Sequence, residues 1–217
     1  MTEIDTAARH LPIVERTSSR VMESSLKRTL DVIVALFALI LLAPLLMLVA
    51  AAIAVEDGGP VLFRQRRTGL HGQIFTVLKF RSMTCAEDGG EVRQASRWDA
   101  RITRVGAVIR ALSIDELPQL CNVLRGDMSL VGPRPHAVRH DEAWDRAIPS
   151  YRQRFRTRPG LTGYAQVRGF RGEVRDLNDI IRRVEADNYY IENWSLKLEL
   201  QILVRTVPLL FHDPNAY

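Results

Sequence analysis

Cysteine is scarce in this chain of 217 residues, which contains only Cys85 and Cys121. Two isolated thiols cannot form a disulfide framework, and no Cys/His spacing suits zinc, so we expect reduced thiols in a cytosolic compartment. The sequence also lacks internal repeats, low-complexity tracts and any motif that reads RNA or DNA. Nucleic acid is therefore not an expected partner, and intrinsic disorder and a disulfide scaffold are both poor fits.

Long hydrophobic runs are almost absent too, because the sequence has a single one, at residues 32–55, in which Pro44 is the only residue that is not hydrophobic. One run excludes a multi-span carrier. As a helix it would be roughly 36 Å long, enough to cross a bilayer, and it begins too late for a signal peptide. We expect a retained membrane anchor at residues 26–57, kinked at Pro44, between a polar leader (1–25) and a cytoplasmic catalytic domain (58–217).

The path of this anchor stays open between two alternatives. Positive charge marks the cytoplasmic side of a membrane helix, and here both ends of the run carry it. The flanking cations are Arg20, Lys27 and Arg28 before the run and Arg64, Arg66 and Arg67 after it. A re-entrant helix that bends at Pro44 and leaves on the face where it entered satisfies both flanks. A kinked but complete span is the other reading, since proline is tolerated in membrane helices.

The net charge of +5 fits anionic lipid or phosphorylated substrates.

The rest of the chain predicts a mostly helical α/β domain with a small sheet. Residues 61–66 and 73–81 are typical of two short strands around a turn at 69–72, and residues 87–96 of a surface loop. Hydrophobic spacing predicts helices downstream, and residues 196, 200, 203 and 207 share one apolar face of the last. The predicted helix starts are Ser24 or Ser25, Asp99, Ser113, residue 144, Asp176 and Ser195.

The densest group of reactive side chains surrounds Asp115 and Glu116. Acids in the first turn of a helix have a structural explanation, because Ser113 and Glu116 have capping-box spacing and carboxylates complement the helix dipole. The same setting suits a nucleophile, since the positive helix end keeps Asp115 ionised. Adjacent helical residues cannot point the same way, so the two acids should have different roles.

A second group centres on Arg134, which lies between Pro133 and Pro135. The two prolines restrict the backbone beneath a planar guanidinium that is suited to phosphate. The alternative is a structural turn with a solvated arginine. Arg158, before another proline, repeats the pattern more weakly. Lys79 and Arg81 add positive charge, which membrane-surface attraction would explain equally well.

These motifs together closely resemble the bacterial sugar transferase family, the monotopic phosphoglycosyl transferases. The similarity runs from about residue 27 to about residue 207, and several long motifs occur in one order. The matching segments are residues 63–65 (FRQ) with Gly69, 79–83 (KFRSM), 113–120 (SIDELPQL), 122–124 (NVL), 128–135 (MSLVGPRP), 158–163 (RPGLTG) and 190–195 (YIENWS).

The resemblance implies transfer of a sugar phosphate from a UDP-sugar donor to polyprenyl phosphate at the cytoplasmic face of the inner membrane, with release of UMP. It makes Asp115 the nucleophile of a covalent phosphosugar intermediate, Glu116 its partner, and Mg²⁺ the cofactor. Asp187 is expected as an acidic ligand of the metal beside Asp115. The expected phosphate- and substrate-binding residues are Arg110, Arg134, Arg158, Lys79, Arg81 and Gln166.

Two positions depart from the family pattern. Ala43 stands where a serine usually precedes the membrane proline, and Arg168 stands where asparagine is common. The sequence does not identify the sugar, for which galactose or glucose is expected by resemblance alone, or the oligomeric state. Two other functions remain to be weighed: a non-catalytic basic module at the membrane, and a metal-dependent phosphohydrolase of lipid diphosphates.

Overall fold

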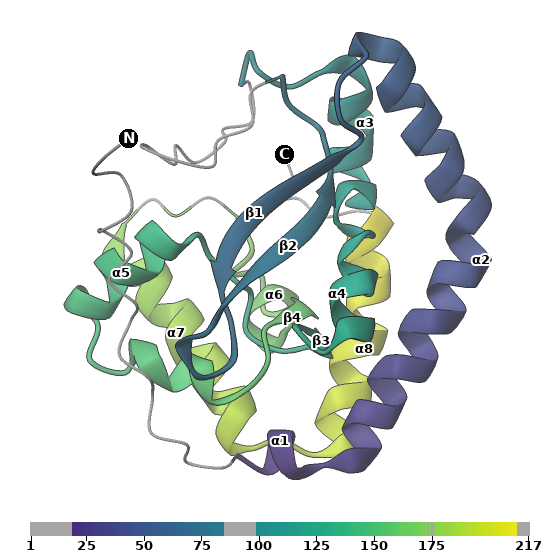
Figure 1. Ribbon diagram of the computed structural model, residues 1–217. Helices are drawn as coiled ribbons and strands as arrows, with labels where there is room; N and C mark the ends of the chain where they lie inside the picture. Colours follow the sequence, from purple (N-terminus) through teal and green to yellow (C-terminus); the bar gives the residue numbers. More distant parts are fainter. Residues whose placement is uncertain (1–18, 85–98, 173, 175, 212–217) are drawn as a thin grey trace, which may run out of the picture.

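The computed structural model describes residues 19–84, 99–172, 174 and 176–211, and it confirms a mostly helical protein with small sheets (Figure 1). The leader residues 1–18, Cys85 and the expected loop at 87–96 lie outside this part. The elements are α1 (Arg20–Glu23), α2 (Ser25–Asp57), β1 (Leu62–Thr68), η1 (Leu70–Gly72), β2 (Ile74–Phe80), α3 (Arg104–Ala111), η2 (Ile114–Glu116), α4 (Gln119–Arg125), β3 (Ser129–Val131), α5 (Val138–Ala147), η3 (Tyr151–Arg156), β4 (Gly160–Thr162), α6 (Tyr164–Val167), α7 (Leu177–Glu192) and α8 (Leu196–Phe211).

The predicted hairpin is confirmed. Strands β1 and β2 pair antiparallel from Leu62 opposite Phe80 to Thr68 opposite Ile74, with η1 in the turn. Strands β3 and β4 form a separate parallel pair that the sequence analysis did not predict. Asn122 of α4 ties the hairpin to the helices, because its side chain accepts a hydrogen bond from Leu78 N and donates one to Thr76 O. This attachment holds the end of β2 against α4 and η2.

Helix α2 contains the whole hydrophobic run. It begins where Ser24 accepts a hydrogen bond from Lys27 N, and it ends at Gly58, whose φ of 66° is the left-handed conformation that glycine favours. Pro44 lies inside the helix, which bows around the right-hand side of the molecule (Figure 1). Among the described residues it is the one helix long and apolar enough to cross a membrane.

Both ends of α2 are bonded to the rest of the domain. Near its start, Arg28 donates to the carbonyl oxygens of Val123 and Leu124 in α4. Near its end, the Glu56 carboxylate accepts from Arg104 N and Val105 N at the start of α3. Both ends of α2 are therefore held against the same domain.

The charges at the start of α2 are used inside the protein. Lys27 is 4% exposed and bonds to Glu199 and to Val131 O. Asp31 is 2% exposed and accepts from Ser129 Oγ and Leu130 N. Lys27 was expected to be one of the flanking cations that mark the cytoplasmic side. That use of Lys27 is wrong, because the residue is buried in an ionic cluster.

Several predicted boundaries also need correction. No helix begins at Asp99, whose carboxylate instead accepts a hydrogen bond from Arg101 N. Helix α3 begins after Thr103, whose side chain accepts a hydrogen bond from Gly106 N. The helix expected at 144–155 is two elements, α5 and η3, separated by residues 148–150. The end of the leader is structured, since Val21 of α1 is buried in the main core. The caps at Asp176 and Ser195 are confirmed.

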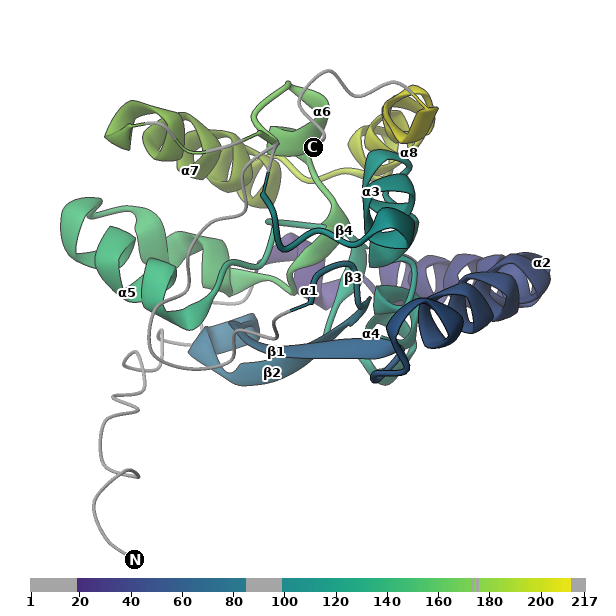
Figure 2. The same cartoon turned by 90° about the horizontal axis from the view of Figure 1, so that it is seen from above.

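Apolar side chains remain exposed on three helices of one side of the molecule. The exposed residues of α2 include Phe37 and Ile40, at 65% and 67% exposure. Helix α3, which packs against α2, exposes Val108 and Leu112. Helix α8 lies on the same side as α2 in both views (Figures 1 and 2) and exposes Leu196, Leu200, Val204 and Val207. Most of the apolar face predicted for the last helix therefore points outward.

Candidate active site

The Asp115–Glu116 pair lies on the short turn η2, between α3 and α4. Ser113 precedes the turn with φ of 56°, a left-handed conformation that is uncommon for serine. Its side chain does not cap the turn, but accepts a hydrogen bond from Arg171 Nη2 at 2.9 Å. The capping box with Glu116 is therefore wrong, and the α-helix expected to start at Ser113 begins only at Gln119.

Glu116 is the centre of a cluster of positive side chains. Arg134 binds it with two parallel hydrogen bonds, Nη2 to Oε1 at 2.6 Å and Nη1 to Oε2 at 3.1 Å. Lys79 Nζ donates to Oε1 at 2.8 Å, and Arg171 Nη2 lies 4.0 Å from Oε2. Burial alone would raise the pKa of Glu116, but Arg134 and Lys79 hold this pKa well below its usual value. Glu116 is a fixed anion.

Asp115 has a different environment. It is 7% exposed, and no hydrogen bond or ion pair joins its carboxylate to the described part of the chain. Burial raises the pKa of Asp115 to about 6, with Glu116 adding to the rise and Lys79, Arg110 and Arg134 opposing it. Desolvation therefore has a larger effect on the pKa of Asp115 than the helix dipole that was expected to keep this residue ionised. At pH 7 the group is still mainly a carboxylate, and it is left without a hydrogen-bond donor.

The cations around the pair come from three elements. Lys79 is on β2, and burial lowers its pKa although Glu116 opposes that shift. Arg110 is in the last turn of α3, where its Nη1 lies 3.9 Å from Met83 Sδ. Arg134 follows β3. The fold therefore surrounds the Asp115 carboxylate with positive charge, an arrangement that can bring an anionic phosphate close to an anionic carboxylate.

A family model described as bacterial sugar transferase matches residues 22–213. The chain belongs to this family. A curated relative from Caulobacter vibrioides, named UDP-glucose:undecaprenyl-phosphate glucose-1-phosphate transferase, is 56% identical over 191 residues, which cover 88% of this chain and 72% of that protein. The family expected from the sequence motifs is thereby confirmed.

Other members of the family differ in length. An Escherichia coli relative with the same name is 45% identical over 192 residues, which cover 88% of this chain and 41% of that protein. The chain thus spans about two fifths of the E. coli relative. The exopolysaccharide production protein PSS of Rhizobium leguminosarum is 44% identical over 190 residues, covering 86% of this chain and 95% of that protein.

The structure brings together five of the expected site residues, which are Lys79, Arg110, Asp115, Glu116 and Arg134. It adds Arg171, which the sequence analysis missed. Arg171 lies beyond α6 and reaches both Ser113 and Glu116. No local spacing signals this contact, because Arg171 is 58 residues from Ser113 in the sequence. The contact depends on how the segment after α6 folds back against η2.

Three other expected residues have contacts elsewhere. Arg81 lies against the turn after α2, where a Cβ on Gly59 would meet its guanidinium. Arg158 Nε donates to Gly126 O at 2.8 Å, and its Nη1 lies 3.7 Å from Met22 Sδ near α1. Gln166 is buried in α6, where its Nε2 is 3.4 Å from Leu161 O.

The expected metal ligands are not brought into one cluster. Asp187 is buried and accepts a hydrogen bond from Arg154 Nε at 2.8 Å. No group of three or more His, Cys, Asp or Glu side chains suited to a metal occurs among the residues that the structure describes. Mg²⁺ often needs only one or two carboxylates when substrate phosphates complete its shell. Asp115 fits that mode, because Glu116 is already held by Lys79 and Arg134.

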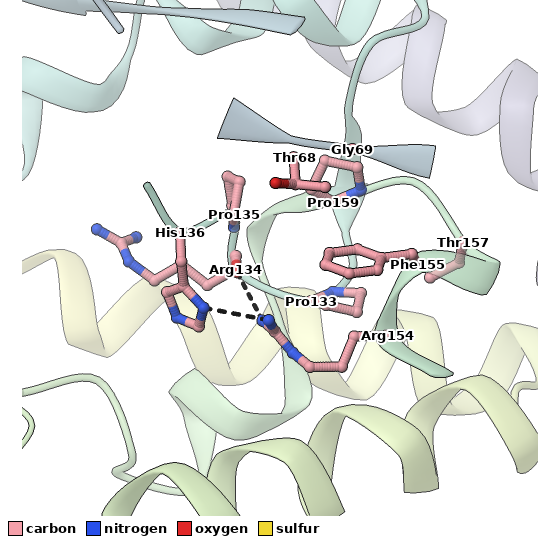
Figure 3. Close-up of a pocket in the computed structure, with 10 residues that line it drawn as sticks. All are labelled: Thr68, Gly69, Pro133, Arg134, Pro135, His136, Arg154, Phe155, Thr157 and Pro159. Atoms are coloured by element: carbon pink, nitrogen blue, oxygen red, sulfur yellow. Dashed lines mark hydrogen bonds between the residues drawn. The ribbon is translucent and has the colours of Figure 1, made fainter. Parts of the chain in front are cut away.

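A pocket opens on the backbone side of the segment that carries Arg134. Its lining comes from the end of β1 and the turn after it, from the segment after β3, and from η3 with the residues that follow it. Figure 3 shows that the Arg134 guanidinium points away from this pocket while its carbonyl oxygen meets the side chain of Arg154. The lining residues are Thr68, Gly69, Pro133, Arg134, Pro135, His136, Arg154, Phe155, Thr157 and Pro159.

Proposed function

We propose that this protein transfers a sugar 1-phosphate from a UDP-sugar to polyprenyl phosphate and releases UMP, as an initiating step of exopolysaccharide or surface-glycan synthesis. A hexose, glucose or galactose, is the expected sugar. The names of the relatives from Caulobacter and E. coli support glucose as the first donor to test, and the Rhizobium relative supports the exopolysaccharide role.

The reaction divides into two displacements at one phosphorus. In the first, a carboxylate oxygen of Asp115 bonds to the phosphorus that carries the sugar, and the bond to the oxygen bridging the two phosphates breaks, releasing UMP. In the second, an oxygen of polyprenyl phosphate attacks the same phosphorus and the bond to Asp115 breaks. Both nucleophiles are already anions, so neither step needs a strong general base.

The positive side chains offset the repulsion between these anions. Lys79 and Arg110 lie where charge develops, and Arg134 is fixed by Glu116 so that it presents its remaining surface to a phosphate. Mg²⁺ bound through Asp115 would neutralise the diphosphate and stabilise the leaving UMP. The roles of the two acids differ: Asp115 reacts, and Glu116 orders the cations.

The apolar helices support a location of this site at a membrane. We infer that α2, with the exposed faces of α3 and α8, seats the domain on the cytoplasmic face of the inner membrane. Both ends of α2 are bonded to the same domain, which supports a helix that enters and leaves on one face. Both the soluble donor and the lipid acceptor then present their phosphates at that interface.

One observation carries the proposal: the buried Asp115 carboxylate, which has no hydrogen-bond partner among the described residues, lies beside three cations. The experiment incubates protein in detergent with Mg²⁺ and UDP-glucose labelled at the β-phosphate, without acceptor. Label should remain on wild-type protein and leave it when polyprenyl phosphate is added. Asp115→Asn should retain no label and give no turnover.

Asp145→Asn is the matched control, because Asp145 lies on α5, where it pairs with Arg152 and takes no part in the cluster around Glu116. It should label as the wild type does. A panel of other UDP-sugars identifies the donor if glucose gives no signal. Free phosphate released without acceptor would indicate a phosphohydrolase, and no UMP from any donor would indicate a non-catalytic module. Near-normal turnover in Asp115→Asn would overturn the mechanism.

A further inference from the structure

Arg154 is a buried arginine that the reaction proposed above does not use. It is 3% exposed, yet all three of its guanidinium nitrogens donate hydrogen bonds. Nε donates to Asp187 Oδ2 at 2.8 Å, and Nη1 donates to the hydroxyl of Tyr151 at 2.9 Å and to His136 Nδ1 at 3.1 Å. Nη2 donates to the backbone carbonyl of Arg134 at 2.7 Å. The last bond connects this buried group to the site.

The bond to Arg134 matters because of its two proline neighbours. Proline has no N–H, so the carbonyl oxygens of residues 133–135 are the main groups by which the fold can hold this segment. All three are bonded: Pro133 O to Gly160 N, Arg134 O to Arg154, and Pro135 O to Arg67 Nη1. The middle bond belongs to the residue whose side chain binds Glu116.

We propose that Arg154 and Asp187 act as positioning residues, which fix the Arg134 carbonyl and so aim the Arg134 guanidinium at Glu116 and the incoming phosphate. The proposal rests on the transfer reaction proposed above. Asp187 is then the residue that orients Arg154 and is not a ligand of the metal. Neither residue touches the reacting atoms.

The charges around Arg154 support a fixed orientation. Its guanidinium lies between the carboxylates of Asp187 and Asp141, the latter 3.9 Å from Nη1. Burial and the charge of Arg154 lower the pKa of His136 to about 3, so the imidazole is neutral and its Nδ1 accepts the hydrogen bond. The Tyr151 hydroxyl accepts from Arg154 and donates to Asp141. Because each of its three nitrogens is bonded in this way, the Arg154 guanidinium has one low-energy orientation.

The first test measures the Arg134 side chain itself and needs no turnover. In protein labelled with ¹⁵N-arginine, the guanidinium signal of Arg134 is the one lost in Arg134→Lys. Arg154→Lys should shift or broaden this signal, and Arg152→Lys, on the exposed side of η3, should not. An unchanged Arg134 signal in folded Arg154→Lys would overturn the proposal.

The second test is a double-mutant cycle on the rate of UMP release. Arg154→Lys should lower kcat about 10-fold with little change in KM, because a misaimed guanidinium costs transition-state alignment. In an Arg134→Met background the same change should have no further effect. Equal losses in both backgrounds would show that Arg154 acts independently of Arg134 and would overturn the proposal.

Asp187→Asn separates positioning from metal binding. The amide oxygen still accepts from Arg154, so most activity should remain and the Mg²⁺ concentration for half-maximal rate should not change. A tenfold or greater increase in that concentration would assign Asp187 to the metal instead. Tyr151→Phe provides a milder change if Arg154→Lys does not fold, and it too should shift the Arg134 signal. Failure of all UDP-sugars with wild-type protein would reject the transfer reaction, while the Arg134 signal would still decide the positioning role.

Discussion

Arg134 holds Glu116 in a two-bond pair, with Nη2 on Oε1 and Nη1 on Oε2. Lys79 binds the same Oε1, so one carboxylate orders two cations. Asp115, the next residue along the chain, has no such partner in the described part of the protein. Two adjacent acids thus have opposite environments, and their pKa values move in opposite directions. This contrast supports the proposed division of roles, in which Asp115 reacts and Glu116 organises the cations.

Replacing Arg134 by lysine tests the paired geometry. Lysine keeps the charge but cannot form two parallel hydrogen bonds with Glu116. Arg134→Lys should lower kcat/KM for UMP release by on the order of 10–100-fold, with little change in the thermal midpoint. Arg139→Lys, on an exposed position of α5, is the control and should behave as the wild type does. Full activity in Arg134→Lys would mean that positive charge alone suffices.

The raised pKa of Asp115 predicts how stability changes with pH. The folded pKa is about 6 and the unfolded value is 3.8, so the folded state binds more protons between these values. Its stability relative to a neutral side chain therefore decreases as pH rises from 3.8 to 6 and stays low above that. Asp115→Asn should be more stable than the wild type by on the order of 1–3 kcal/mol at pH 7, and the gain should shrink towards pH 4.

Thermal unfolding with a metal chelator measures this difference without bound Mg²⁺. Asp145→Asn serves as the comparison, since it removes a carboxylate that is paired with Arg152 and should bring no gain that grows with pH. A constant difference between the wild type and Asp115→Asn from pH 4 to pH 8 would contradict the raised pKa. An inactive variant that is more stable would also show that the lost activity is not due to unfolding.

Gly106 predicts a stability effect opposite to its helix propensity. Alanine inside a helix normally adds about 1 kcal/mol over glycine. Here a Cβ on Gly106 would lie 2.1 Å from Ser82 O, a backbone atom that also accepts from Thr103 N. Gly106→Ala should therefore destabilise the protein by about 1–3 kcal/mol and reduce activity, because α3 carries Arg110.

Ala107→Gly, on the exposed side of the same helix, gives the reference for propensity alone and should cost about 1 kcal/mol. The free energy of unfolding is compared for the three proteins. A more stable Gly106→Ala would show that α3 and the segment at Ser82 can separate at little cost.

Local patterns predicted the fold where local physics decides it. The hairpin and the caps at Ser24, Asp176 and Ser195 all depend on residues close in sequence. The parallel pair of β3 and β4 was missed because its strands have three residues each and join segments about 30 residues apart. Strands of that length carry no readable period.

The site shows the same division. Asp115, Glu116 and Arg134 were found because their motifs are contiguous, but spacing could not show that Glu116 and Arg134 bind each other. Arg158 was expected from its resemblance to the Arg134 segment, yet it bonds to Gly126 at the end of α4. Lys27 has the composition of a membrane flank and is nevertheless buried, because Glu199, 172 residues away, supplies its countercharge. Long-range pairing of charges cannot be read from composition.

The bonds at the two ends of α2 predict the topology of the membrane anchor. Arg28 holds the start of the helix to α4, and Glu56 holds its end to α3. A hydrocarbon layer of about 30 Å between those ends would break one set of contacts. Cysteines placed at Ser25 and at Pro60, in a chain with Cys85 and Cys121 replaced by serine, should therefore lie on the same side of the membrane.

Labelling with a membrane-impermeant maleimide measures this directly. In intact cells neither Ser25→Cys nor Pro60→Cys should react, and after permeabilisation both should. Phe37→Cys, in the apolar middle of α2, should stay protected in both conditions because its side chain would lie among lipid chains. Reaction of one end but not the other in intact cells would establish a complete span, and the contacts of Arg28 or Glu56 could then not persist in the membrane.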